Sequence, residues 1–516
     1  MADEYPKLMK ITIGTHYFKI TNMQPRMIGV VQKFCVKYVQ MEYQNSRGKR
    51  VLAPGKVYAT RTKDNSEYRF HIGQYPEFIQ HLYHNDVEIA LCDIIKRDLI
   101  DSPDIDIDLN KGWVLRDDQN AVKDFILQSE ETDLHTRMAT LYTGFGKTVV
   151  ALASAADINK RVLVTVLSKY QDKWASDVVK TLNIKPKEVM VISGSHNVRG
   201  LIALAQSGQL EAKCIIISIN TLNNYLKAYE DDPHTTTNDD FGCAPENFCE
   251  LLGIGTMIVD EVHEHIHAVF KMLLYTHVYK VIALSGTLIS LDPFIQKIHS
   301  LMFPKEVRYD KAVMNKYIKC YAIGYSVISV PVSKIRTTQF GSNLYSHNAF
   351  EKYILKHKPL LDNYLKIIDN IIELGYIQNY KDGNKLGVYA SSIDMCSTIT
   401  HHLKKKYPDL DVRRYVEQDP YENAIEADIR VTTILSAGTA FDIPMLTDVI
   451  MTNSIKSPVS NLQTLGRLRE LKDRDVRFYY LYCEQIPKHV EYHKAKKELF
   501  EPKVISTKDY KSPISL

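Results

Sequence analysis

A glycine-rich segment at residues 138–148, MATLYTGFGKT, carries residue types that can hold a phosphate group. Gly144 and Gly146 lack a Cβ, so neighbouring backbone N–H groups can curl around phosphate oxygens at a helix N-terminus. Lys147 is spaced to reach the β- and γ-phosphates, and the Thr148 hydroxyl to hold Mg²⁺. The generic pattern has a glycine where this chain has Leu141. We predict an ATP site formed by Thr143, Gly144, Phe145, Gly146, Lys147 and Thr148.

A second segment, IVDEVH at residues 258–263, ends an apolar run with two adjacent acids. Asp260 is suited to hold Mg²⁺, and Glu261 to polarise the water that attacks a phosphate. His263 is expected beside the γ-phosphate. The alternative interpretation is a strand that ends in solvated acids.

Two further segments could complete a phosphoryl-transfer site. Residues 285–287 (SGT) follow another apolar run, and residues 461–470 read NLQTLGRLRE. Phosphoryl transfer places charge on the γ-phosphate, which an arginine from a second domain can neutralise. Gln463, Arg467 and Arg469 are therefore further catalytic candidates, against the alternative of ordinary surface arginines on a helix.

The elements that must position these residues read as two series of short apolar runs separated by helical stretches. Such runs are typical of parallel sheets covered on both faces, which bind ligands at the carboxyl ends of their strands. The runs are 138–142, 162–167, 214–218, 257–260 and 281–285, then 386–390, 412–416, 429–434, 449–452 and 478–482.

Composition places the chain among ordinary globular proteins, with 516 residues, 45% hydrophobic and 24% charged. No apolar run is long enough to span a membrane. The eight cysteines form no CxxC pair, which favours reduced thiols. Residues 1–70 hold 13 Lys and Arg against 5 Asp and Glu, a net +8, which favours contact with phosphates over a merely solvated surface.

We predict five regions along the chain. They are a basic nucleic-acid-binding domain (1–108), an ATP-binding parallel-sheet domain (109–302), a connector with the start of a second domain (303–380), a second parallel-sheet domain (381–495) and a tail (496–516). Residues 229–240, YEDDPHTTTNDD, read as a surface loop.

The ordered motifs resemble superfamily 2 helicases of the DExH-box kind over about residues 113–485. LRDDQ at 115–119 is similar to the element whose Gln contacts adenine, which nominates Gln119. TTILSAGTAFDIP at 432–444 resembles the motif that nominates Gly438 and Asp442. The common QxxGRxxR form places its last arginine at position 470, where this chain has Glu470; Arg469 lies one residue early. By the same resemblance, Ser218, Thr221, Ser391 and Thr433 are expected phosphate partners along a bound strand.

The resemblance implies an α/β fold with two RecA-like parallel-sheet domains in tandem behind a small α+β N-terminal domain. It implies ATP and Mg²⁺ as cofactors, and a cytoplasmic helicase or translocase that acts as a monomer on nucleic acid, with DNA favoured over RNA. The DEVH box and GTAFDIP look most like bacteriophage UvsW-type helicases, and more distantly like XPB-like and poxviral transcript-release helicases. Those relatives imply remodelling of branched DNA in replication, recombination or repair. The alternatives are a duplex translocase or transcript-release factor without strand separation, and a non-hydrolysing nucleic-acid-binding protein.

Overall fold

The computed structural model forms two compact units, Met1–Ala312 and Val313–Leu516. It describes residues 7–46, 49–99, 102–128, 135–142, 144–286, 292–310, 316–338, 344–416, 419–420, 422–434, 436, 443–471 and 473–516. Four residues named above, Thr143, Thr287, Gly438 and Asp442, lie outside these ranges.

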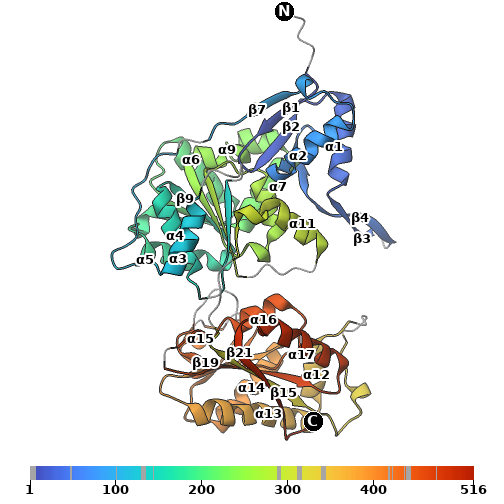
Figure 1. Ribbon diagram of the computed structural model, residues 1–516, viewed down its shortest axis with the longest axis vertical. Helices are drawn as coiled ribbons and strands as arrows, with labels where there is room; N and C mark the ends of the chain where they lie inside the picture. Colours follow the sequence, from blue (N-terminus) through green and yellow to red (C-terminus); the bar gives the residue numbers. More distant parts are fainter. Residues whose placement is uncertain are drawn as a thin grey trace, which may run out of the picture. The chain divides into compact units, whose positions relative to one another are not determined.

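The first unit begins with a small mixed sheet of strand order β5-β6-β2-β1-β7, drawn in blue in Figure 1. Its strands are β1 (Lys10–Ile13), β2 (Tyr17–Thr21), β5 (Ala59–Arg61), β6 (Tyr68–His71) and β7 (Asp93–Lys96). Two helices pack on it, α1 (Pro25–Val36) and α2 (Tyr75–Tyr83). Between α1 and β5, the strands β3 (Val39–Ser46) and β4 (Lys49–Val57) pair only with each other.

The rest of the first unit is a seven-stranded sheet of order β10-β11-β9-β12-β13-β8-β14, in which every pair is parallel. Its strands are β8 (Thr136–Thr140), β9 (Arg161–Val166), β10 (Val189–Ile192), β11 (Cys214–Ser218), β12 (Ile254–Val259), β13 (Lys280–Ser285) and β14 (Arg308–Tyr309). Its helices are α3 (Asp117–Leu127), α4 (Lys147–Ile158), α5 (Gln171–Thr181), α6 (Ser195–Gln206), α7 (Ile219–Asp231), α8 (Pro233–Thr235), α9 (Pro245–Leu251), α10 (Ile266–Leu273) and α11 (Pro293–Met302). Figure 1 shows α4 and α5 on one face of the sheet and α7 and α11 on the other.

The second unit is another seven-stranded parallel sheet, of order β17-β18-β16-β19-β20-β15-β21. Its strands are β15 (Ile318–Tyr325), β16 (Lys385–Ala390), β17 (Val412–Tyr415), β18 (Ile429–Thr433), β19 (Leu446–Met451), β20 (Val476–Cys483) and β21 (Val504–Lys511). Its helices are α12 (His347–Lys356), α13 (Lys358–Ile371), α14 (Ile393–Lys406), α15 (Glu422–Ile425), α16 (Pro458–Leu465) and α17 (Pro487–Phe500). Residues of α12, α13 and α14 form one hydrophobic cluster on this sheet, and residues of α16 and α17 a separate one.

This architecture confirms the predicted fold class, two parallel-sheet α/β domains of the RecA-like kind with a small N-terminal α/β region. Two strands lie outside the apolar runs found in the sequence: β15 in the stretch assigned to the connector and the start of the second domain, and the edge strand β21 in the stretch assigned to a tail. Within the described residues, none of the helices is both long and apolar enough to cross a lipid bilayer. All eight cysteines are free thiols.

The expectation of a loop at residues 229–240 was wrong. The segment continues α7, forms the single turn α8 and ends in a π-helical turn at Thr236–Asp240. The Asp232 carboxylate accepts a hydrogen bond from the Thr235 backbone N–H and caps the turn. The polar residues of this segment therefore form a short capped helical turn and not a loop.

An ion cluster ties the small sheet to the first parallel-sheet domain. Arg69, 1% exposed, bonds the carboxylates of Glu67 at 2.5 Å and Glu246 at 2.7 Å. Lys19 bonds the other oxygen of Glu246 at 2.6 Å. Burial alone would raise the pKa of Glu246, but Arg69 and Lys19 outweigh it and lower the pKa to about 2. Any shift between the two sheets would leave a buried charge without its partner, which is costly. The cluster therefore favours one arrangement of the two sheets.

Buried histidines form a second link between the same parts. His277 accepts a hydrogen bond from the Thr15 backbone N–H at 3.0 Å through Nδ1 and donates from Nε2 to the Asp98 carbonyl at 2.7 Å. Burial and the neighbouring histidines hold the pKa of His16 well below its usual value, and burial lowers the pKa of His71 to about 3. These imidazoles are therefore neutral in the folded protein.

The depressed pKa of His71 predicts a loss of stability in acid. In the unfolded chain this histidine is protonated below about pH 6.5, whereas in the folded chain it stays neutral. The free energy of unfolding therefore decreases as the pH falls below that value, with a limiting slope of about 1.4 kcal/mol per histidine per pH unit. Between pH 6.5 and 5.5, the wild type should lose about 1 kcal/mol more unfolding free energy than His71→Gln, measured by urea unfolding. Equal losses in the two proteins would contradict this assignment.

Candidate active site

The predicted phosphate-binding residues gather at the carboxyl edge of the first parallel sheet. Strands β12, β13 and β8 are neighbours, so the segments that follow them emerge side by side. The Leu141 backbone N–H donates to the Ser285 carbonyl at 2.9 Å, which extends the β8–β13 pairing into the loop. Asp260 and Glu261 follow β12, and Gly286 follows β13.

Two glycines shape the loop that precedes α4. Gly144 and Gly146 both have φ of 94°, a left-handed conformation that side chains disfavour. A Cβ on Gly146 would lie 2.6 Å from Gln119 Nε2. Gln119 Nε2 donates to the Phe145 carbonyl at 2.8 Å, and Arg116 donates to the same oxygen at 2.9 Å. Because that carbonyl is tied back, the loop is held with its glycines at the N-terminus of α4.

A chain of contacts joins the three segments at the sheet edge. Lys147 Nζ lies 2.8 Å from Glu261 Oε1, and His263 Nδ1 lies 3.3 Å from Glu261 Oε2. The same His263 nitrogen lies 2.9 Å from the Ser285 hydroxyl. Glu261 itself has φ of 45°, so its backbone is held in a conformation rare for a residue with a side chain. Strained backbone at the end of a strand is common where side chains do chemistry.

The two acids of the site have pKa values displaced in opposite directions. Burial and the neighbouring Glu261 raise the pKa of Asp260. Burial opposes the ionisation of Glu261, but Lys147 and His263 outweigh it and lower the pKa of Glu261. Burial lowers the pKa of His263, although the neighbouring Glu261 opposes this. Glu261 is thus an ionised carboxylate at neutral pH, next to a cation.

Trp174 on α5 fixes the orientation of Asp260. The Trp174 indole N–H donates to Asp260 Oδ2 at 2.9 Å, and the Glu261 backbone N–H donates to Oδ1 at 2.9 Å. Trp174 is 2% exposed, so the ring has little freedom. The sequence motifs did not pair Trp174 with Asp260, which follows it by 86 residues. An aromatic N–H donor cannot be assigned to a particular carboxylate from spacing alone.

The donor set fits a magnesium-bound nucleoside triphosphate. Backbone N–H groups at the start of α4 and the Lys147 ammonium suit phosphate oxygens, and the left-handed glycines leave room for them. Thr148 in the first turn of α4 and Asp260 supply the hard oxygen ligands that Mg²⁺ prefers. The site can bind a phosphate chain and place a carboxylate, Glu261, beside it.

The candidate arginines of the second unit lie at the end of α16. Gln463 is on this helix and half-buried, whereas Arg467 follows it and is 4% exposed. Burial raises the pKa of Tyr389 and lowers that of Arg430; the nearby charge of Arg467 opposes the first shift and adds to the second. Arg469 donates from Nη1 to the Gly466 carbonyl, a local bond that closes the turn after the helix.

The hydroxyls expected to contact a bound strand have partners inside the protein. Ser218 and Thr221 are 2% and 6% exposed. The Ser218 hydroxyl accepts from the Thr221 backbone N–H and caps α7, while Thr221 Oγ1 accepts from the Gly194 backbone N–H. In the second unit, the Thr433 hydroxyl donates to the Ser436 hydroxyl at 2.8 Å. These hydroxyls hold the ends of strands and helices together through contacts within the protein.

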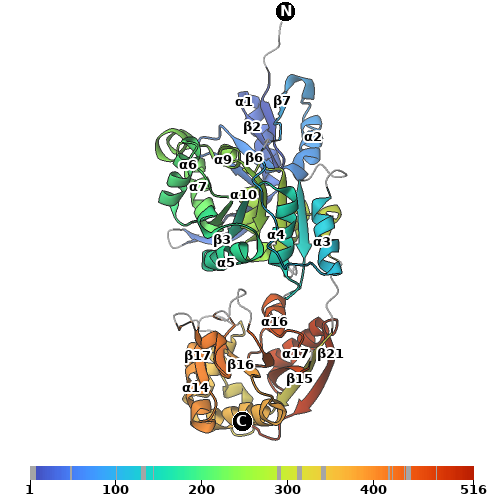
Figure 2. The same ribbon diagram turned by 90° about the vertical axis from the view of Figure 1, so that its left-hand side faces the viewer.

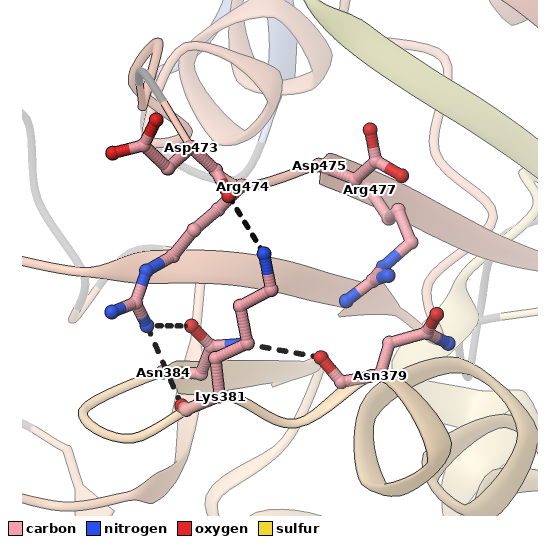
Figure 3. Close-up of a pocket in the computed structure, with 7 residues that line it drawn as sticks. All are labelled: Asn379, Lys381, Asn384, Asp473, Arg474, Asp475 and Arg477. Carbon is pink, nitrogen blue, oxygen red and sulfur yellow. Dashed lines mark hydrogen bonds between the residues drawn. The ribbon is translucent and has the colours of Figure 1, made fainter.

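A polar pocket of about 370 Å³ lies in the second unit, at the edge of the sheet where the strands begin (Figure 3). Lys381 donates to the Asp473 carbonyl, and Arg474 donates to backbone carbonyls and to the Asn384 side chain. Asn384 and Asp475 directly precede β16 and β20, so the pocket is at the amino ends of the strands. Its cations brace the turns that enter the sheet, away from the edge where open α/β sheets bind ligands.

Comparison with known proteins gives one family match within the chain. Residues 113–290, about a third of the sequence, match the model of the type III restriction enzyme, res subunit. This segment includes Lys147, Asp260 and Ser285. No curated protein matches the sequence.

Several solved structures resemble the chain at low identity. Saccharomyces cerevisiae Dbp5 bound to RNA and ADP BeF3 is 9% identical over 76% of this chain and 89% of its own, with a TM-score of 0.48. The DEAD-box helicase Mss116 bound to ssRNA and UDP-BeF is 16% identical over 76% and 74%, with a TM-score of 0.47. The Pyrococcus furiosus Hef helicase domain is 14% identical over 74% and 98%, with a TM-score of 0.43. Because these scores are below 0.5, the description of the fold rests on the strand order of this chain.

Replacing the glycine at the entrance to α4 should destabilise the protein. Gly146→Ala forces a side chain into a left-handed conformation and against Gln119, at a cost of about 1–3 kcal/mol. The matched control is Gly200→Ala within α6, where a Cβ meets nothing within 4 Å. That substitution should stabilise by about 0.5–1 kcal/mol. Urea unfolding measures both, and a neutral Gly146→Ala would contradict the left-handed loop.

Proposed function

We propose that this protein hydrolyses ATP and uses the energy to move along nucleic acid, as a helicase or translocase of superfamily 2. The observation that carries the proposal is the convergence of Lys147, Glu261 and His263 at the carboxyl edge of the first parallel sheet, behind a glycine loop at a helix N-terminus. These groups follow two strands of the sheet, β8 and β12, and together they match the needs of phosphoryl transfer to water. The match of residues 113–290 to a restriction-enzyme subunit model supports the same chemistry.

Lys147 and Glu261 have paired roles in this mechanism. An incoming phosphate competes with Glu261 for the Lys147 ammonium, so nucleotide binding releases the carboxylate. Glu261 is ionised at neutral pH and can then accept a proton from the attacking water. Thr148 and Asp260 would hold Mg²⁺, which neutralises charge on the phosphates when bound. Without a nucleotide, the ion pair keeps the base occupied.

The remaining candidate residues complete the proposed site. Gln119, which already braces the Phe145 carbonyl, is proposed to contact adenine. His263, which contacts both Glu261 and Ser285, would link the protonation and position of Glu261 to the segment that follows β13. From the second unit, Gln463, Arg467 and Arg469 are proposed to act on the γ-phosphate, with Gly438 and Asp442 in the neighbouring motif.

The proposed substrate is branched or forked DNA, as in replication, recombination or repair, acted on by a monomer in the cytoplasm of a cell or a viral host. Support comes from the net +8 charge of residues 1–70 and from the resemblance to UvsW-type helicases. The ordered motifs serve a duplex translocase or a transcript-release factor equally well, so these stay as the alternatives. ATP hydrolysis stimulated by single strands, with strand separation, distinguishes the helicase from both.

Lys147→Ala should abolish ATP hydrolysis, because it removes the phosphate contact and leaves Glu261 without its partner. The loss should be at least about 100-fold in kcat, measured by phosphate release with and without single-stranded DNA. Lys169→Ala, an exposed lysine after β9, is the control and should hydrolyse ATP as the wild type does. Retained turnover in Lys147→Ala would overturn the site assignment.

The two arginines after α16 should differ in their effects on hydrolysis. Arg467→Lys keeps the charge but loses the guanidinium geometry, and should lower kcat by about 10³-fold with the ATP KM nearly unchanged. Arg469→Lys should have a much smaller effect, because Arg469 bonds the Gly466 carbonyl. A larger loss in Arg469→Lys would reverse the assignment, and steady-state kinetics at saturating DNA decides between them.

A further inference from the structure

Helix α5 turns one buried side toward three strands of the first parallel sheet. It follows β9, and Figure 2 shows it beside α4, the helix that begins with Lys147. Gln171, the first residue of α5, is 3% exposed, and Trp174, about one turn later, is 2% exposed. Because residues three apart are neighbours on the surface of a helix, these two side chains reach the sheet together.

Gln171 fixes the start of α5 to two of these strands. Its Nε2 donates to the Ile192 carbonyl at the end of β10, at 2.8 Å, and to the Ile216 carbonyl in β11, at 3.3 Å. Its Oε1 accepts a hydrogen bond from the Ser193 hydroxyl at 2.8 Å. Any slide of the first turn of α5 along the sheet would leave a buried amide unpaired, which is costly. The helix therefore presents Trp174 from a fixed base.

The third strand is β12, which Trp174 reaches through the acid that follows it. The indole N–H donates to Asp260 Oδ2 at 2.9 Å, and the Glu261 backbone N–H donates to Oδ1 at 2.9 Å. One donor on each oxygen sets the plane of the carboxylate from two sides, and both oxygens keep lone pairs for another ligand. The indole is a neutral donor, so it orients Asp260 without cancelling the charge that a metal ion needs.

We propose that Trp174 is a positioning residue that makes the site favour Mg²⁺ over larger cations. Mg²⁺ demands near-ideal octahedral geometry, whereas Ca²⁺ accepts an irregular set of oxygen ligands. A carboxylate that rotates freely serves either ion, but one held by Trp174 and the Glu261 N–H offers its lone pairs in one direction. The inference rests on the proposed function for the nucleotide and its metal, and it adds the residue that sets the choice of metal.

The test compares Trp174→Phe with a control on the same helix. Trp174→Phe removes the N–H and keeps an aromatic ring in the core. Val178→Ala, about one turn further along α5 at a position that is 0% exposed, opens a cavity but removes no hydrogen-bond donor. Isothermal titration calorimetry measures the Kd of each full-length protein for the β,γ-imido analogue of ATP, once in excess Mg²⁺ and once in excess Ca²⁺.

Trp174→Phe should bind the analogue about tenfold more weakly than the wild type in Mg²⁺ and within about twofold of it in Ca²⁺, because only Mg²⁺ depends on a fixed carboxylate. Val178→Ala should match the wild type with both ions. Unchanged binding in Mg²⁺, equal weakening with both ions, or the same pattern in Val178→Ala would overturn the proposal.

A second measurement keeps the indole in place. The chain has two tryptophans, so protein labelled with ¹⁵N-tryptophan gives two indole N–H signals, and Trp113→Phe identifies the one from Trp174. Adding Mg²⁺ to the protein with the analogue bound should move the Trp174 signal, because the ion draws on the carboxylate that accepts its hydrogen bond. An unmoved signal would count against the proposal.

ATP hydrolysis with and without DNA, measured in parallel, separates this proposal from the proposed function. A wild type that shows the expected ion-dependent binding but no DNA-stimulated hydrolysis would refute the motor function and leave the role of Trp174 standing. DNA-stimulated hydrolysis with the same Mg²⁺ requirement in the wild type and in Trp174→Phe would refute the role of Trp174 alone. A wild type that does not bind the analogue would overturn both.

Discussion

The parallel alignment of β8, β13 and β12 is the constraint on which the site depends. Lys147 and Glu261 are 114 residues apart in sequence, yet their side chains meet at 2.8 Å because both strands end at the same edge. An antiparallel neighbour would send one of them to the opposite edge. The strand order brings the two side chains together, and their opposite charges then form the ion pair.

That ion pair also sets the protonation of the site. Two buried carboxylates in succession cannot both ionise freely, and the burial of Asp260 and Glu261 raises the cost further. Lys147 lies nearest to Glu261, so Glu261 takes the charge and the pKa of Asp260 rises. Trp174 then hydrogen-bonds Asp260 without adding a charge. Two acids at adjacent positions in the chain thereby acquire different pKa values.

The sequence predicted the parts of the fold whose signal is local. Strands such as β11, CIIIS, and β12 are buried along their whole length, and their continuous apolar runs identify them. The strand β15 alternates between buried and half-buried residues, and β21 lies at an edge with a polar sequence, so neither gives such a run. The glycine loop and the acids were predicted because the chemistry needs those residue types. Trp174 was not, since its role depends on where its ring points.

The N-terminal sheet shows how a region that looks separate in sequence becomes part of the first compact unit. Its aromatic core, including Phe18 and Phe70, belongs to the same hydrophobic cluster as Met257 and Val281 of the first parallel sheet. Arg69 and Glu246 add a buried ionic contact across the same boundary, and such a pair fixes geometry more than it adds stability. Tyr58, which follows β4, stacks on Phe294 of α11, so this part of the N-terminal region is also packed against the first parallel-sheet domain. The small N-terminal sheet is thus packed against the first parallel-sheet domain through both apolar and ionic contacts, rather than joined to it by a tether.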